Sequence, residues 1–161
     1  MSGAPPAALR PALPGDTPVL AAIARAAIFE LTGEDYDEDQ QEAWADVAGD
    51  EAALAARLAG QLTLVATHDG DPVGFIVLAD NRAIDLLYVL PLFTGEGVGA
   101  LLCDAVEKLA AARGAKSLTA DASDNALGFF QKRGYVPKSR NTVPLGGVWL
   151  GNTTVEKKLG E

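Results

Sequence analysis

The spacing of apolar residues divides the chain into helical and extended segments. In the first third, apolar residues recur three or four positions apart, as they do on one face of a helix. The clearest run comprises Val19, Leu20, Ile23, Ala27 and Ile28 and ends near Leu31. This periodicity predicts three helices at 16–31, 37–47 and 50–60, preceded by a short strand at 7–12. Asp16 or Thr17 is the expected N-cap of the first helix.

The pattern changes at Gln61, after which apolar residues alternate or run continuously, as in strands. Two strands at 62–67 and 73–80 are predicted around a turn, "HDGDP", that contains His68. The next run, "RAIDLLYVL", is nearly all apolar, which indicates a central strand. The remaining predicted elements are a helix at 98–113, a strand at 116–121, a helix at 123–134 with Ser123 or Asp124 as its cap, and strands at 135–143 and 148–159. This order predicts one mixed α/β domain over residues 1–161.

Charge and cysteine content narrow the classes of function. The 161 residues include 13 Lys and Arg against 22 Asp and Glu, a formal net charge of −9. Such a surface repels nucleic acid and anionic lipid, so we expect neither as a partner and favour a cationic small substrate. A single cysteine, no leader-like N-terminus and no apolar run of about 20 residues predict a cytoplasmic protein. With His68 as the only histidine, we expect no metal site.

The stretch "VLPLFTGEGVGA", residues 89–100, joins the apolar strand to a helix through three glycines. Glycines at such a junction allow backbone amides to approach a phosphate. The nucleotide motif GxxxxGK[ST] is absent, and the even spacing of Gly95, Gly97 and Gly99 does not match GxGxxG. The alternative is that these glycines serve only a tight turn between strand and helix.

Two motifs in this order resemble the GNAT superfamily of N-acetyltransferases. "TGEGVG", from Thr94 to Gly99, resembles the end of the superfamily's first motif, and "NALGFFQKRGY", from Asn125 to Tyr135, resembles its second. The resemblance implies a mixed, mostly antiparallel sheet, splayed in the middle, with helices on both faces. It also implies transfer of an acetyl group from acetyl-CoA, without a metal, to a primary amine of a small molecule or protein. A homodimer is possible through the C-terminal strands, and a non-catalytic acyl-CoA-binding protein is the alternative function.

The same resemblance implies a set of coenzyme-binding residues. Backbone amides of the glycine loop would bind the pyrophosphate, with the Glu96 side chain turned to solvent. Because relatives often carry Arg or Gln where Thr94 and Glu96 stand, we expect weaker coenzyme binding here. A bulge near the end of the motif strand would open a slot in which backbone groups pair with the pantetheine arm and the Val89 amide faces the thioester oxygen. The implied coenzyme-binding residues are Leu87, Tyr88, Val89, Thr94, Gly95, Glu96, Gly97, Val98, Gly99, Ala100, Asn125, Phe129 and Phe130.

Some of these residues have a purely structural alternative. Asn125 either binds the pantetheine arm or caps the following helix. Phe129 and Phe130 either contact the coenzyme or pack in the core, the latter more so for Phe129. Many relatives carry a tyrosine at the position of Phe130 as a general acid. A thiol with a pKa near 8.5 is a tolerable leaving group without one, and Ser123 is a possible substitute.

The candidate bases are carboxylates, because an attacking amine must first lose its proton. Asp85 stands out as a charge within an apolar strand, and its alternative role is an ion pair with Arg82 or Arg140. Glu30, together with Glu34, lies where relatives shape the acceptor pocket. Tyr36 and Trp44 either line that pocket or fill the core, and Cys103 is expected to be a buried, unreactive thiol. The predicted catalytic groups are therefore the side chains of Asp85 and Glu30 and the backbone amide of Val89.

Overall fold

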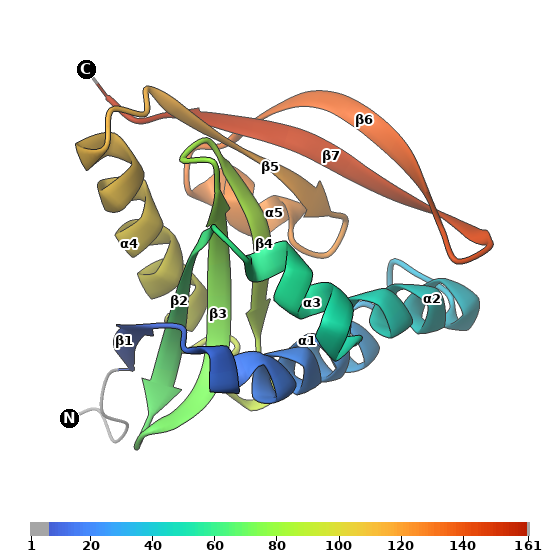
Figure 1. Cartoon of the computed structure of the whole chain (residues 1–161). Helices are drawn as coiled ribbons and strands as arrows, with labels where there is room; N and C mark the ends of the chain where they lie inside the picture. The colour runs from blue at the N-terminus through green and yellow to red at the C-terminus, as the bar shows by residue number, and fades with distance from the viewer. Residues whose placement is uncertain (1–6, 161) are drawn as a thin grey trace.

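The computed structural model describes residues 7–160, which form a seven-stranded sheet with helices on both faces (Figure 1). The strand order is β1-β2-β3-β4-β5-β7-β6. Within this range the strands are β1 (Ala8–Pro11), β2 (Leu62–His68), β3 (Asp71–Ala79), β4 (Ala83–Val89), β5 (Ser117–Ser123), β6 (Val136–Leu145) and β7 (Val148–Lys158). The helices are α1 (Thr17–Leu31), α2 (Glu38–Ala48), α3 (Glu51–Leu58), α4 (Val98–Ala112) and α5 (Leu127–Lys132), with 3₁₀ turns at Pro14–Asp16 and Pro91–Phe93.

The sheet is antiparallel except between β4 and β5. These two strands run parallel and pair only at Ala83↔Thr119 and Ile84↔Ala120. Beyond Ile84 they separate, so the middle of the sheet opens as a fork. The predicted central position of the 82–90 strand, the mixed fold and the splayed sheet are confirmed.

Two apolar clusters hold the helices to opposite faces of the sheet. On one face α4 contributes fully buried residues such as Leu102 and Val106, which pack with Ile76 and Leu118. On the other face Leu20 and Ile23 of α1, with Leu54 of α3, pack against Val65, Phe75 and Val77. Residues that alternate along β2 and β3 enter opposite clusters, as the strand period of two requires.

A bulge in β4 breaks this alternation at the fork. Val77 pairs with Leu86 and Leu78 pairs with Ile84, which leaves Asp85 as the extra residue. Ile84 therefore packs in the α4 cluster whereas Leu86, two positions on, packs in the α1 cluster. The bulge was expected near the end of the strand, but it lies at the third residue of β4. It coincides with the point where β4 leaves β5.

Local capping explains where several helices begin. The Asp37 carboxylate accepts from the Gln40 amide, and the Gln40 side chain accepts from the Asp37 amide, so α2 begins with a capping box. Asp50 caps α3 through a single bond, which its carboxylate accepts from the Ala53 amide. Asp16, an expected cap of α1, makes no such bond to that helix and instead accepts from the Leu13 amide.

The expected start of α5 is wrong. Ser123 is the last residue of β5 rather than a helix cap. Helix α5 begins at Leu127, and its N-cap residue, Ala126, makes no side-chain capping bond. The expected turn around His68 is also shifted. His68 ends β2, and the turn consists of Asp69 and Gly70, both with positive φ.

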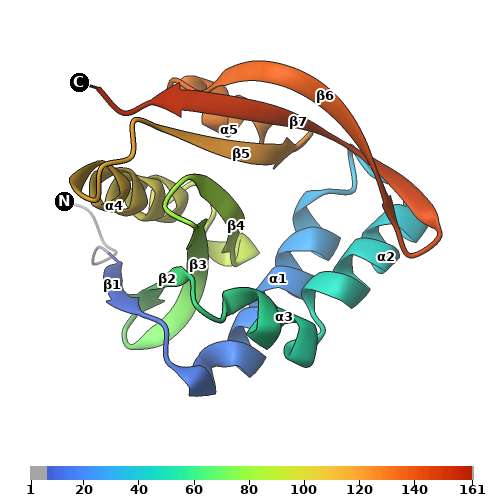
Figure 2. The ribbon, with the colours of Figure 1, turned by 45° about the horizontal axis from the view of Figure 1, so that its top comes forward.

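The β6–β7 hairpin forms a long arm that extends across the molecule toward α2 (Figures 1 and 2). Its tip lies against α2, where a Cβ added to Gly146 would sit 3.2 Å from the Ala43 Cβ. The Gln40 side-chain amide donates to the Trp149 carbonyl at 2.7 Å. The arm and α2 thus close off one side of the fork, the side on which α3 also lies.

Candidate active site

The glycine loop presents unpaired backbone donors at the start of α4. The first backbone bond of α4 runs from the Leu101 amide to the Gly97 carbonyl at 2.9 Å, so the amides of Val98 to Ala100 precede the helical bonds. Gly97 is the N-cap, with φ 83°, and no side chain caps this end. Gly95 has φ 82°, and a Cβ at either glycine would meet no atom within 4 Å. The loop fits an anion bound by main-chain donors and the helix dipole.

Glu96 is exposed at this loop, so its side chain is in contact with solvent. Thr94 is also exposed, and its hydroxyl donates to the Pro91 carbonyl at 2.8 Å within the turn before the loop. Neither residue places a positive charge beside the free amides. The third glycine, Gly99, packs instead against the Phe129 ring, whose Cζ lies 3.3 Å from an added Cβ.

The outer half of β4 presents backbone groups to the open fork. The Leu90 amide donates to Val73 of β3 at 2.8 Å, and the Tyr88 carbonyl lies against Gly74 of β3. Because backbone groups alternate sides along a strand, the amides of Leu87 and Val89 face away from β3, into the fork. The backbone N–H and C=O groups of Tyr88 point toward β3, so the expectation that they pair with a ligand is corrected. Tyr88 borders the fork through its side chain.

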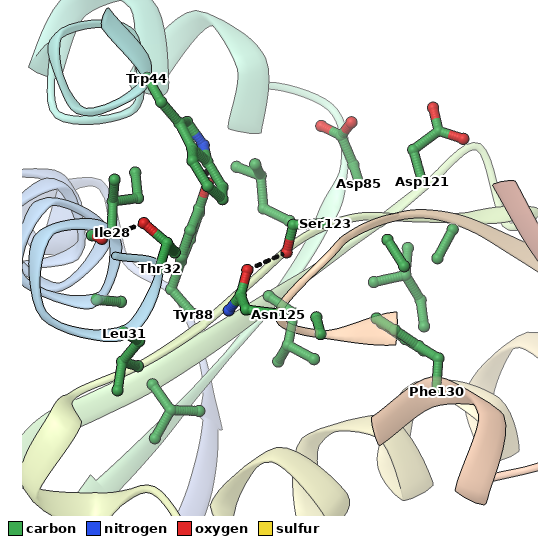
Figure 3. Close-up of a pocket in the computed structure, with 18 residues that line it drawn as sticks. Ile28, Leu31, Thr32, Trp44, Asp85, Tyr88, Asp121, Ser123, Asn125 and Phe130 are labelled. Atoms are coloured by element: carbon green, nitrogen blue, oxygen red, sulfur yellow. Dashed lines mark hydrogen bonds between the residues drawn. The ribbon is translucent and has the colours of Figure 1, made fainter. Parts of the chain in front are cut away.

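A cavity that is open to solvent lies in the fork (Figure 3). We call it the fork cavity. Its walls come from β4, the end of β5, the end of α1, α2, α5 and the segment before α5. The lining residues are Ala27, Ile28, Leu31, Thr32, Trp44, Ile84, Asp85, Leu86, Leu87, Tyr88, Val89, Ala120, Asp121, Ala122, Ser123, Asn125, Ala126 and Phe130.

A second cavity, also open to solvent, lies under the β6–β7 arm. We call it the arm cavity. Residues of α2, α3, β4, β5, β6 and β7 line it, including Arg57, Thr119, Leu145 and Asn152. Eight residues border both cavities, so the two spaces meet at the bulge. These shared residues are Trp44, Ile84, Asp85, Leu86, Tyr88, Ala120, Asp121 and Ser123.

Asp85 is fixed at this junction by Arg57 of α3. The Arg57 Nε and Nη2 atoms donate to the two carboxylate oxygens at 2.7 and 2.9 Å. The hydrogen bond to Asp85 raises the pKa of Arg57. The alternative role of Asp85, an ion pair, is therefore present, but its partner is Arg57 and not Arg82 or Arg140. Arg140 pairs with Asp124 instead.

Trp44 and Tyr88 meet across the junction and connect α2 to β4 (Figure 3). The Trp44 indole N–H donates to the Tyr88 hydroxyl oxygen at 3.0 Å. Burial raises the pKa of Tyr88 to about 12, so its phenol stays protonated at neutral pH. The sequence singled out Trp44 but assigned no role to the Tyr88 side chain.

Tyr36 closes the end of the β5–β7 ladder above the arm cavity. Its hydroxyl donates to the Gly151 carbonyl at 2.7 Å and accepts from the Asp124 amide at 2.9 Å. Its ring packs edge-on against Trp44, with centroids 5.4 Å apart. Both aromatic residues therefore line the cavity, while Tyr36 is also buried.

Comparison with known proteins assigns the chain to one family. The acetyltransferase (GNAT) domain model matches residues 32–150. The Escherichia coli (strain K12) protein described as the uncharacterized N-acetyltransferase YafP is 33% identical over 139 residues, covering 86% of this chain and 87% of its own. The chain belongs to the GNAT family of acetyltransferases.

Solved structures agree with this assignment. The crystal structure described as "GCN5-Related N-acetyltransferase: Aminotransferase, Class-II" from Rhodopseudomonas palustris is 58% identical, with a TM-score of 0.93 and coverage of 98% of this chain and 99% of that one. The PaiA N-acetyltransferase of Thermoplasma acidophilum, solved with coenzyme A, is 23% identical, with a TM-score of 0.78 and coverage of 94% and 98%. At that identity the likeness shows the fold alone.

Of the other residues expected to contact the coenzyme in this GNAT domain, some line the fork cavity and some are packed in the protein interior. Asn125 lines the fork cavity and accepts from the Ser123 hydroxyl at 2.7 Å; it is not the N-cap of α5. Phe130 is 4% exposed in the α4 cluster and also borders the fork cavity. Phe129 packs on Gly99 at the base of the glycine loop, and the Arg133 guanidinium lies 5.9 Å from its ring centre.

The two candidate acidic residues at the end of α1 and just after it, Glu30 and Glu34, line neither cavity. Both are exposed. The carboxylate that sequence reasoning missed is Asp121, which borders both cavities from β5. Its signal in the sequence is weak, because "KSLTAD" places it at an ordinary strand end.

Cys103 is fully buried in the α4 cluster, as expected. Burial raises the pKa of its thiol to about 12, which makes it a poor nucleophile. Within residues 7–160, His, Cys, Asp and Glu side chains form no group of three or more placed to hold a metal ion. Over the same residues, no helix has the length and apolarity needed to cross a membrane.

Proposed function

We propose that this GNAT protein transfers an acetyl group from acetyl-CoA to a primary amine by direct attack. The observation that carries the proposal is the meeting of two cavities at the β4 bulge. One cavity borders the free amides of β4, and the other opens beneath the arm. A donor and an acceptor that enter from opposite sides would meet at Asp85, Tyr88 and Asp121.

Backbone groups supply the coenzyme-binding part of this site. The amides of Val98 to Ala100 would hold the pyrophosphate, and the amides of Leu87 and Val89 face the fork where an extended pantetheine arm would lie. Acetyl-CoA supplies the activated thioester. The Val89 amide would donate to the carbonyl oxygen as negative charge develops on it during attack.

The residues at the junction would handle the protons. Asp85 is a candidate base, but its two oxygens already accept from Arg57, so an incoming amine would have to compete with that guanidinium for the carboxylate. Asp121 has no such partner among the described residues and is the second candidate. The protonated Tyr88 hydroxyl borders the same cavity and can donate toward the departing sulfur, a role that Phe130 cannot fill.

The absence of a phenol at position 130 motivates a second candidate function, a protein that binds acyl-CoA without catalysis. The two functions are separated by an assay of thiol release from acetyl-CoA with a panel of primary amines, alongside calorimetry of coenzyme A binding. Turnover with any amine supports the transferase. Coenzyme binding without thiol release from any amine supports the non-catalytic protein, and no binding at millimolar coenzyme overturns both.

A further inference from the structure

The arm cavity carries the features of a site for one class of amine. Resting on the transferase function above, we propose that it takes a primary monoamine with an aromatic or similarly bulky apolar body, an arylalkylamine, whose ammonium group is held by Asp121. The apolar walls, the balance of charge and the position of Asp121 each support this assignment.

The walls of the arm cavity are mainly aromatic and aliphatic. Tyr36 and Trp44 meet edge-on at one side, and the indole is fixed by its bond to Tyr88. A fixed aromatic wall binds an apolar body at little cost in side-chain entropy and attracts a nearby ammonium group. The aliphatic residues of the lining are Val47, Ala48, Ala83, Ile84, Leu86, Ala120, Val143, Leu145 and Leu150.

The charges in the arm cavity leave one carboxylate unneutralised. Its charged lining residues are Arg57, Asp85 and Asp121. Arg57 and Asp85 neutralise each other in a two-pronged pair. Asp121 accepts from the Thr154 hydroxyl at 2.6 Å and has no Lys or Arg within salt-bridge distance in the described part of the chain. The cavity therefore has a net charge of −1, which matches one ammonium group.

The position of Asp121 places that ammonium group where transfer would occur. Asp121 borders the arm cavity and the fork cavity, close to Asp85 at the junction (Figure 3). An amine held there would extend its apolar body under the arm and present its nitrogen to the fork. Because the aspartate accepts hydrogen bonds from the ammonium form, it also positions the group that must lose a proton before attack.

The same charges disfavour two other classes of amine. A polyamine carries a second ammonium group, and the arm cavity lining offers no second free carboxylate to receive it. An amino acid carries a carboxylate, which Asp121 would repel and which Arg57 cannot bind without sharing its guanidinium with Asp85. Phenethylamine and L-phenylalanine differ only in this carboxylate and are therefore a matched pair of probes.

The test measures kcat/KM for phenethylamine, tryptamine, spermidine and L-phenylalanine with saturating acetyl-CoA. We expect the two arylalkylamines to exceed spermidine and L-phenylalanine by at least about tenfold, the effect of one charge-assisted contact. Asp121→Asn should raise the KM for phenethylamine by about tenfold or more and leave the KM for acetyl-CoA unchanged. Glu42→Gln, an equal charge change on the exposed face of α2, is the control and should change neither KM.

Two results would overturn the inference while leaving the transferase function intact. One is spermidine or L-phenylalanine as the better substrate, and the other is an unchanged phenethylamine KM in Asp121→Asn. If none of the four amines releases thiol, binding of phenethylamine to the coenzyme A complex is measured directly by calorimetry. Binding that weakens in Asp121→Asn would support the site and count against catalysis, whereas no binding would refute the site itself.

Discussion

Glu96 is a single residue with a defined electrostatic effect at the coenzyme loop. It is exposed next to the N-cap of α4, where the helix dipole and free amides favour an anion and a carboxylate opposes one. We predict that Glu96→Arg lowers the Kd for coenzyme A several-fold at low ionic strength, since one screened charge at a helix end contributes about 0.3–1 kcal/mol. Calorimetry at low and high salt measures this, and the gain should shrink as salt rises.

A control for Glu96 comes from the start of another helix. Glu51→Arg makes the same charge change in the first turn of α3, outside the lining of both cavities. It should leave the Kd for coenzyme A unchanged. If Glu96→Arg has no effect, or if both variants change the Kd equally, the anion site does not lie at the first turn of α4.

Cys103 gives a pH-dependent prediction at the same scale. Burial raises the pKa of its thiol to about 12, against about 8.5 for an exposed cysteine. The folded protein should therefore react with a thiol reagent at pH 8 at least about a hundredfold more slowly than the protein in denaturant. Because the unfolded state loses this proton first, the contribution to stability is complete below about pH 8.5 and is lost as pH rises toward 12.

The control for this prediction is Cys103→Ala, which should show no reaction in either state and a smaller loss of stability between pH 9 and 11. Fast labelling of the native protein at pH 8 would contradict the buried position in α4. The measurement is absorbance of the released chromophore together with urea unfolding at each pH.

At the scale of single elements, the start of α4 depends on a backbone conformation that favours glycine. Gly97 has φ 83°, and an added Cβ would meet no neighbouring atom, so strain in the backbone rather than a clash limits substitution. Gly97→Ala should lower the free energy of unfolding by about 1–2 kcal/mol. It should also raise the Kd for coenzyme A, because the amides of Val98 to Ala100 would shift with the turn.

Gly128 in α5 provides the matched control, since an added Cβ there also meets no atom within 4 Å and its φ is not positive. Gly128→Ala should leave stability unchanged or raise it by less than about 1 kcal/mol. Urea unfolding and calorimetry of both variants decide the point. Equal effects of the two substitutions would show that the left-handed turn is not required.

Periodicity predicted most elements because local capping and apolar spacing act within a few residues. Asp37 and Asp50 cap the helices that follow them, and the two glycines with positive φ lie in the expected loop. The start of α5 was missed because Ser123 keeps its place in β5, with its backbone paired to Asn152. A long-range strand pairing thus overrode a local capping signal.

The candidate site was predicted less completely, because its main contacts join residues far apart in the sequence. Arg57 lies 28 residues before Asp85, in a helix that two strands separate from β4 along the sequence. The bulge that exposes Asp85 is equally hidden, since only pairing with β3 shows that one residue of β4 has no partner. The glycine loop was predictable because its donors belong to one continuous segment.

At the scale of the whole molecule, one hydroxyl group joins the end of the β5–β7 ladder to the segment between α1 and α2. The paired β5–β7 ladder ends at Ser123↔Asn152, and the next groups, the Asp124 amide and the Gly151 carbonyl, both bind Tyr36. Tyr36 is 5% exposed and comes from the segment between α1 and α2. It therefore fixes the arm relative to the helices that complete the arm cavity.

This arrangement predicts that Tyr36→Phe separates stability and acceptor binding from coenzyme binding. The variant keeps the ring against Trp44 but loses two hydrogen bonds, which should lower the free energy of unfolding by about 1–3 kcal/mol. With the arm less firmly held, the KM for an amine acceptor should rise by a larger factor than the KM for acetyl-CoA, because the free amides of α4 and β4 lie on the other side of the fork. Urea unfolding and steady-state kinetics with both substrates varied measure these effects. An equal rise in both KM values would mean that Tyr36 holds the fork as a whole, and an unchanged stability would mean that the arm stays closed on α2 through Gln40 and Gly146 alone.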